Sequence, residues 1–288
     1  MCLIHRLAGI ATFVNAIFHT CIAFGDVKSQ NISTLIAPIA FAALAITSLP
    51  PIRKYWYEPF LRVHQLSSIV GAFSLWWHVS TTNTFVFICQ TVIAIVFLTA
   101  LVTHIAMILY RNDVYHGGPA ARITGSDELV QIELELKKPL SIQPGQYVNL
   151  WIPSLGICSF AQSHPFIVVS WSETPMHSLR LVVEPLNGLT RKMAEAANRS
   201  SEPRKALFSG PHGKSFTLQG YSNVVIIATG LGIFAQLPYL QKLAHCSDKR
   251  RIHVVWYMGS SNDTPTPGVA YDMAKDTINK ALEKNHVC

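Results

Sequence analysis

The sequence predicts a multi-domain membrane protein, in which an α-helical bundle (residues 1–112) precedes a β-barrel (115–217) and a partial α/β nucleotide-binding-type domain (220–288). Half of the 288 residues are hydrophobic and only 14% are charged. Before residue 110 the apolar residues form long stretches, each close to the ~20 residues that cross a bilayer. After residue 110, short apolar runs alternate with polar turns. The long stretches lie at about 3–24, 33–50, 60–80 and 84–110.

The basic residues predict how these stretches cross a lipid bilayer. Arg53, Lys54 and Arg62 lie in or beside the second connection, and Arg111 closes the fourth stretch. The first and third connections contain Lys28 and no arginine. Because positive residues gather on the cytosolic side, we expect the second connection and everything after residue 110 to be cytosolic. The formal charge of +7 then partly reflects topology, and no motif for nucleic acid is present.

Four histidines form two pairs with the same spacing, His5 with His19 and His64 with His78, each reading H-x13-H. Fourteen residues of helix advance roughly 21 Å and turn through about 1400°, so both members of a pair lie on one side of their helix at two depths. The first stretch also carries Arg6 and lacks a small-residue cleavage site. We therefore expect it to stay in the chain as a helix and not to be removed as a signal peptide.

These pairs predict two metal positions within the bundle. On the predicted topology the first and third helices are parallel, so His5 meets His64 near the cytosolic side and His19 meets His78 near the outer side. A neutral imidazole is a strong axial ligand for haem iron, and one on each face leaves no position free. A single histidine such as His104 is more often packed or hydrogen-bonded. The repeated spacing, and the cost of polar groups at membrane depth, favour ligands for the four paired residues.

Short strands follow the bundle and are typical of an antiparallel barrel. They are expected at Val130–Leu136, Gly145–Ile152, Phe166–Trp171 and Leu179–Glu184. The segment Gly188-Leu189-Thr190-Arg191-Lys192 then opens a helical stretch. Its backbone N–H groups and the hydroxyl of Thr190 suit a pyrophosphate, although this signal alone is weak.

The last part of the chain reads as strand, glycine turn, helix and strand. After the tight turn Gly210-Pro211-His212-Gly213, a continuous apolar run at Val224–Ala228 is typical of a parallel, fully buried strand. It leads through Thr229-Gly230-Leu231-Gly232-Ile233 into a helix ending near Leu243 and a strand at His253–Tyr257. Two glycines there either let a phosphate approach the backbone or form an ordinary loop. We expect a loop at Ser260–Pro267 and a polar helix at Tyr271–Lys284.

Together these segments resemble the ferric reductase and NADPH oxidase family, and most of all the fungal ferric-chelate reductases. The resemblance covers nearly the whole chain. Its most specific parts are the two H-x13-H helices, Tyr57-Glu58-Pro59-Phe60, Trp76-Trp77-His78, Gln162-Ser163-His164-Pro165-Phe166, and Ala228-Thr229-Gly230-Leu231-Gly232-Ile233 continuing into Leu237-Pro238-Tyr239-Leu240.

The resemblance implies two b-type haems, FAD and NADPH as cofactors. It implies that the paired histidines bind the haems and that the H-P-F segment binds FAD against the barrel. By position, the implied FAD contacts are His164, Pro165, Phe166, Ile167, Gly188 and Thr190, and the implied nucleotide contacts are Gly210, Thr229, Gly230 and Gly232. Three departures accompany it: Ile167 stands where the family usually has a hydroxyl residue, the bundle has fewer helices, and the nucleotide domain is shorter.

The function implied is an NADPH-dependent ferric-chelate reductase, which passes electrons through FAD and the haems to an iron chelate outside. An NADPH oxidase that reduces dioxygen, and a shortened paralogue without turnover, are the alternatives. The plasma membrane is the expected location and the vacuolar membrane the second choice. The sequence predicts no oligomeric state.

Overall fold

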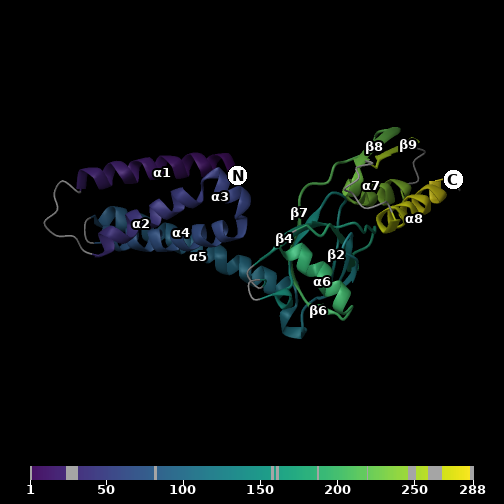
Figure 1. Ribbon diagram of the computed structural model, residues 1–288, viewed down its shortest axis with the longest axis horizontal. Coiled ribbons are helices and arrows are strands. Elements are labelled where there is room, and N and C mark those ends of the chain that lie inside the picture. The colour runs from purple at the N-terminus through teal and green to yellow at the C-terminus, as the bar shows by residue number, and fades with distance from the viewer. Residues whose placement is uncertain are drawn as a thin grey trace. The chain divides into compact units, whose positions relative to one another are not determined.

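The computed structural model describes residues 2–23, 32–80, 83–156, 159, 162–186, 188–218, 220–245, 251–258 and 268–285. The expected loop at Ser260–Pro267 and the first connection with Lys28 lie outside these residues. The chain divides into two compact units, Met1–Val102 and Thr103–Cys288, and each is described by itself (Figure 1).

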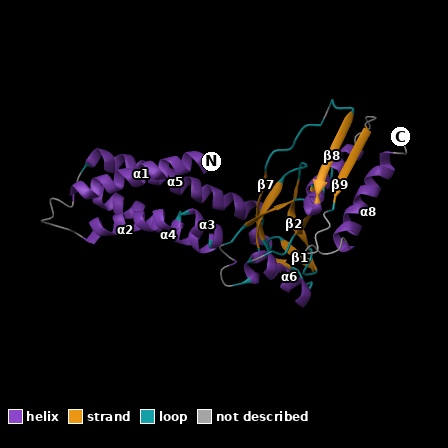
Figure 2. Cartoon of the chain, turned by 45° about the horizontal axis from the view of Figure 1, so that its top comes forward, coloured by secondary structure: helices purple, strands orange, loops and turns teal. Residues whose placement is uncertain are grey.

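All four predicted apolar stretches are helical. The helices of the first unit are α1 (Cys2–Ala23), α2 (Ile32–Thr47), α3 (Pro50–Tyr55), α4 (Tyr57–Ser80) and the greater part of α5 (Thr84–Arg111), whose last residues belong to the second unit (Figure 2). The short helix α3 was not predicted. It begins with Pro50, which is tolerated there because the first turn of a helix needs no backbone N–H donor.

Small side chains bring α2 and α4 together. Ala40 of α2 is buried, and a Cβ built on Gly71 of α4 would lie 3.5 Å from the Ala40 Cβ. Such residues let helix backbones approach closely in an apolar bundle. The indole Nε1 of Trp76 donates to the Thr91 hydroxyl at 3.0 Å and ties α4 to α5.

Among the residues that can be described, one helix is long and apolar enough to cross a membrane, at Thr84–His116, and a shorter apolar helix spans Leu35–Thr47. Helices α1 and α4 are less uniformly apolar because each contains an arginine and two of the paired histidines. Of the four predicted membrane spans, only α5 therefore meets both the length and the apolar composition that a span requires.

The predicted barrel consists of two antiparallel sheets around one core and is not closed. One sheet has the order β5-β2-β1-β6 and the other β4-β3-β7. Alternate residues of β2, such as Ile132 and Leu134, are fully buried between the sheets. We call these two sheets, with the helix α6, the open barrel. Its strands are β1 (Ala120–Gly125), β2 (Val130–Leu140), β3 (Tyr147–Trp151), β4 (His164–Ile167), β5 (Met176–Val183), β6 (Arg204–Lys205) and β7 (Leu207–His212).

The strand expected at Phe166–Trp171 is divided between the two sheets. Up to Ile167 the chain pairs with β3 as strand β4. Val168 then bridges to Leu181 of β5, and the Val169 N–H donates to the Arg180 carbonyl at 2.8 Å. The chain therefore changes partner at Val168, and this change ends β4 earlier than the apolar pattern predicts.

Short helical elements complete the open barrel. The 3₁₀ turns are η2 (Val114–His116) and η3 (Pro153–Leu155), and the predicted helix after Gly188 is α6 (Leu189–Arg199). Helix α6 is amphipathic, and it buries Leu189 and Met193 in the core of the two sheets. This apolar face fixes the N-terminus of α6 against the two sheets.

The last elements form the predicted strand, turn, helix and strand. They are β8 (Asn223–Thr229), η5 (Gly230–Gly232), α7 (Ile233–His245), β9 (Arg251–Tyr257) and α8 (Gly268–Asn285). Strands β8 and β9 lie parallel and side by side (Figure 2).

The prediction of full burial for the run at Val224–Ala228 was wrong. Both α7 and α8 contribute residues to one apolar cluster with Val224, Ile226 and Ala228. On the other face Val225 and Ile227 are 60% and 69% exposed. Since the described helices cover a single face of this sheet, alternate residues of the run stay exposed.

Candidate cofactor sites

The bundle brings the paired histidines together as the spacing predicts. The ring centres of His5 on α1 and His64 on α4 lie 6.2 Å apart with planes inclined at 69°. The rings of His19 and His78, farther along the same two helices, lie 6.4 Å apart at 68°. One helical repeat therefore produces two facing pairs of nearly the same geometry.

The separation of the rings fits two imidazoles on opposite faces of one iron. A metal–imidazole bond of about 2 Å, with ~1.1 Å from the nitrogen to the ring centre, puts two such centres about 6 Å apart. Gly9 lies one turn after His5, and a Cβ there would have no heavy atom within 4 Å. The histidines therefore fit axial ligation, and α1 leaves open space beside the first pair.

Two further residues contact His64: Phe60, which lies one turn earlier on the same face of α4, and Ser48, for which the sequence has no signal. The Ser48 hydroxyl lies 3.4 Å from the His64 Nδ1 and the Phe60 ring centre 5.3 Å from that of the imidazole. A hydrogen bond to one ring nitrogen orients the other toward a metal. Ser48 reaches His64 from a turn sixteen residues away, which sequence spacing cannot reveal.

The register of β3 and β4 decides which residues face outward beside the open barrel. Val148 is opposite Phe166, and both side chains are in the core, with Phe166 only 7% exposed. Tyr147 is opposite Ile167, which is 43% exposed, and Asn149 is opposite the exposed Pro165. The structure thus puts Phe166 inside the core, whereas its neighbours Pro165 and Ile167 lie on the outer face and His164 is half-buried.

Strand β7 adds polar groups to the same side of this sheet. Tyr147 is opposite His212, with ring centres 5.5 Å apart. The His212 Nε2 lies 3.1 Å from the Ser209 hydroxyl, and the Asn149 amide donates to that hydroxyl at 3.4 Å. Tyr147, Asn149 and Ser209 were not predicted, although the alternation of Gly145–Ile152 indicates that the first two share one face of the strand.

Around the start of α6 the groups present fit an anion. Gly188 precedes α6 with φ 65°, and a Cβ there would have no heavy atom within 4 Å. The Ser159 hydroxyl is buried and has no hydrogen-bond partner among the described residues. A Cβ on Gly156 would lie 2.9 Å from the Lys192 Nζ and 3.3 Å from the Ser159 Oγ, so an ammonium group reaches this place. The predicted Thr190 hydroxyl accepts a hydrogen bond from the Leu186 N–H at 3.1 Å and so also holds the turn.

The predicted nucleotide residues fall into two places. Gly230 has φ 49°, and neither Gly230 nor Gly232 has a heavy atom within 4 Å of a built Cβ, so the turn after Thr229 is open. The Trp256 indole holds this turn by donating to the Gly230 carbonyl at 2.9 Å. Gly210 is different, because its φ is 135° and a Cβ would lie 3.1 Å from the Tyr147 carbonyl oxygen. Close packing of β7 on β3 is enough to require glycine at this position.

Family models match both units of the chain. Residues 1–75 match a ferric reductase-like transmembrane component, and residues 119–241 match an FAD-binding domain. The resemblance to the ferric reductase family is confirmed. The chain is thus a membrane protein with an FAD-binding domain of an oxidoreductase family.

Curated relatives agree with these matches. The chain is 31% identical to the ferric/cupric reductase transmembrane component 2 of Saccharomyces cerevisiae over 202 residues, 68% of this chain and 27% of that protein. It is 25% identical to component 7 of the same yeast over 76% of this chain and 35% of that protein. It is 24% identical to the ferric reduction oxidase 4 of Arabidopsis thaliana over 82% of this chain and 32% of that protein. The chain spans about a third of the length of these relatives.

Solved structures give a more distant match. A ferredoxin-NADP+ reductase from Plasmodium falciparum shares 14% identity with a TM-score of 0.40, over 58% of this chain and 68% of that one.

Proposed function

We propose that this chain transfers electrons across a membrane, from NADPH on the cytosolic side through FAD and two haems to a ferric chelate on the other side. The observation that carries the proposal is the pair of facing imidazoles at each of two depths, 6.2 and 6.4 Å apart. Each pair of histidines would hold a haem, which would supply single-electron transfer. Two such sites separated by roughly 21 Å along the helices divide the crossing of an apolar core of about 30 Å into short steps.

The open barrel supports the proposed FAD site through two groups of residues. FAD held here would supply the change from two-electron to single-electron transfer, which suits a path between a pyridine nucleotide and haems. Tyr147 and Ile167 form an apolar outer surface against which a ring system can lie, with His212 beside it. The start of α6 and Lys192 provide N–H donors and a positive charge for a pyrophosphate. Gly188 and Thr190 belong to this second group. We propose His164 as a further polar contact on the face of β4 that it shares with Phe166, where the two ring centres lie 6.5 Å apart.

The nucleotide site is proposed at the open glycine turn. Thr229, Gly230 and Gly232 precede helix α7, whose N-terminus offers backbone N–H groups to a phosphate. The proposed domain bounds are 1–112 for the haem domain, 115–217 for the FAD domain and 220–288 for the nucleotide domain.

Location and substrate follow from charge and from relatives. The arginines in and beside the second connection, and Arg111 at the end of α5, support a multi-pass topology with the open barrel in the cytosol. Relatives named ferric or cupric reductases support a metal chelate as the acceptor. The plasma membrane is the proposed location, with the vacuolar membrane as the second choice.

Haem spectra of membranes containing the full chain test the proposal. We expect a low-spin spectrum of the bis-imidazole type. His64→Ala should remove the haem on the cytosolic side, and His78→Ala should remove the outer haem and leave the other spectrum largely unchanged. His104→Ala, in an exposed position on α5, is the matched control and should keep both haems. Spectra unchanged by both substitutions in α4 would contradict the proposal.

The acceptor is tested separately. NADPH-driven reduction of a ferric chelate is measured with and without superoxide dismutase. We expect the same rate in both, since electrons pass to the chelate directly. A rate abolished by the dismutase would identify dioxygen as the acceptor.

A further inference from the structure

The end of α5 is held by a fully buried asparagine. Asn112 follows the last helical residue and is 0% exposed. Its Nδ2 donates to the Ile108 carbonyl and to the Phe208 carbonyl, both at 2.7 Å. Its Oδ1 accepts from the Phe208 N–H at 2.9 Å. The side-chain amide therefore satisfies the last turn of the helix and one residue of β7 at once.

This contact is specific because a side-chain amide, like a peptide group, has an N–H donor and a carbonyl acceptor side by side. Phe208 presents both its N–H and its carbonyl to Asn112, as it would to a neighbouring strand. Arg111, the preceding residue, donates to the carbonyl of Gly210 on the same strand. Two consecutive residues thus attach the helix end to β7 in the three-stranded sheet.

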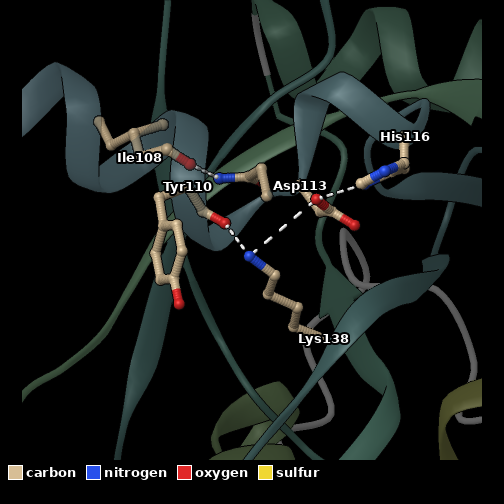
Figure 3. Close-up of polar contacts among 6 residues, drawn as sticks. Ile108, Tyr110, Asp113, His116 and Lys138 are labelled. Atoms are coloured by element: carbon tan, nitrogen blue, oxygen red, sulfur yellow. Dashed lines mark hydrogen bonds and ion pairs between the residues drawn. The ribbon is translucent and has the colours of Figure 1, made fainter.

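The other sheet holds the same helix end through Lys138. This lysine of β2 donates from Nζ to the Tyr110 carbonyl at 2.7 Å, and the Nζ also lies 3.7 Å from the centre of the Tyr110 ring (Figure 3). Its Nζ is 4.0 Å from Asp113, whose carboxylate pairs with His116 at 2.9 Å. A cation at the C-terminus of a helix donates hydrogen bonds to free carbonyl groups and is attracted to the negative end of the helix dipole.

Without these contacts the segment after α5 would be free to bend. Asp113 has φ 48°, and Gly117 and Gly118 have φ 97° and 69°. Asparagine, aspartate and glycine in such conformations are typical of turns and flexible connections. The hydrogen bonds of Arg111, Asn112 and Lys138 therefore oppose bending here, together with the backbone hydrogen bonds that His116 and Gly118 donate to the Asp113 carbonyl.

We propose that Asn112 is a positioning residue, and that with Arg111 and Lys138 it forms a clamp that fixes the open barrel on the end of α5. Strand β7, which the clamp holds, also carries Ser209 and His212 beside the proposed flavin surface. The consequence for electron transfer rests on the proposed function. A fixed strand would keep a bound flavin at one distance from the last turn of α5, and the rate of electron transfer depends on distance.

The clamp is tested first without any cofactor chemistry. Genetically encoded spin labels replace Met107 on α5 and Glu195 on α6, two exposed positions, in the full chain. Pulsed electron resonance should give a narrow distance distribution in the otherwise native protein and a broad one in Asn112→Ala. Asn198→Ala is the matched control, since this exposed asparagine donates to Asp127 within the open barrel, and it should keep the narrow distribution.

A second variant covers failure of Asn112→Ala to fold. Lys138→Met removes the cation from a partly exposed position and leaves an unbranched apolar side chain, so we expect it to fold and to broaden the distribution less. Distributions as narrow as the native one in Lys138→Met, and in Asn112→Ala where it folds, would overturn the clamp.

Electron transfer supplies the second readout. Flavin is photoreduced in the presence of EDTA, and haem reduction is followed in the Soret band. We expect haem reduction to be several-fold slower in Asn112→Ala, with haem and FAD contents unchanged. A native rate in this variant, despite a broad distance distribution, would overturn the link to electron transfer. Absence of haem reduction in the native chain would instead contradict the proposed function, and the distance measurement would still decide the clamp.

Discussion

The histidines of α1 and α4 and the outer residues of β3, β4 and β7 are positioned by different rules. In the helices, rise and rotation along one segment set the depth and direction of each histidine. On the sheet, Tyr147, Ile167 and His212 meet only because three strands are in register. Sequence spacing therefore encodes the helical site directly, whereas the sheet site depends on pairings between distant segments.

The same difference decides how far a side chain moves when its segment is shifted by one residue. In a helix a shift of one residue turns a side chain by about 100° and moves it by about 1.5 Å. In a strand it moves the side chain to the opposite face. Phe166 illustrates the second case, because it lies in the core beside Val148 while its neighbours Pro165 and Ile167 face outward.

The largest expected effect comes from breaking the helical spacing. One alanine inserted after Gly71 turns His78 by about 100° relative to His64 and should remove the outer haem while the other stays. Haem per protein, measured as the pyridine haemochrome, should fall by about half. The control is Gly71→Ala, which introduces an alanine at the same place without rotating the rest of the helix. Its Cβ would lie at an ordinary 3.5 Å from the Ala40 Cβ, and the variant should keep both haems. Full haem content after the insertion would show that His78 is not a ligand at this spacing.

The second prediction separates the two faces of the sheet. Tyr147→Ala removes an aromatic surface from the outer face and should weaken FAD binding about tenfold, which corresponds to about 1.4 kcal/mol. Phe166→Leu changes a core residue of similar character and should leave FAD affinity within a few-fold. Fluorescence titration of FAD into the apoprotein gives both values. FAD lost through Phe166→Leu and kept in Tyr147→Ala would reverse the assignment of the faces.

Helical features were the more predictable part of this molecule. All four apolar stretches, both histidine pairings, and the strand order of the last elements could be derived from periodicity and spacing. The contacts of Ser48 and Asn112 could not, since they join segments sixteen and ninety-six residues apart. The exposed face of β8 was also missed, because an apolar run gives no information on which helices cover it.

The third prediction concerns the open glycine turn. Gly232→Val places a branched side chain where a built Cβ meets no heavy atom within 4 Å, so the fold should tolerate it. The added volume would occupy the space through which a pyrophosphate approaches the start of α7, and we expect NADPH-driven flavin reduction to need several-fold more NADPH. Stopped-flow absorbance measures this, and reduction by dithionite should be unchanged. An unaltered NADPH dependence would put the nucleotide elsewhere.

The smallest expected effect tests the single covered face of β8. Ile226 is 6% exposed beneath α7 and α8, and its neighbour Ile227 is 69% exposed. Threonine keeps the β-branched shape at both positions, so the two substitutions differ mainly in burial. Ile226→Thr replaces a buried ethyl group by a hydroxyl, which should cost about 1–3 kcal/mol and lower the thermal midpoint by several degrees. Ile227→Thr exchanges groups that water already reaches, so the free energy of unfolding should stay within about 0.5 kcal/mol of the native value.

Thermal unfolding of the full chain in detergent, followed by tryptophan fluorescence, distinguishes the two substitutions. Equal and large losses would mean that both faces of the sheet are covered in solution, and that register does not separate inner from outer residues here as it does in β4.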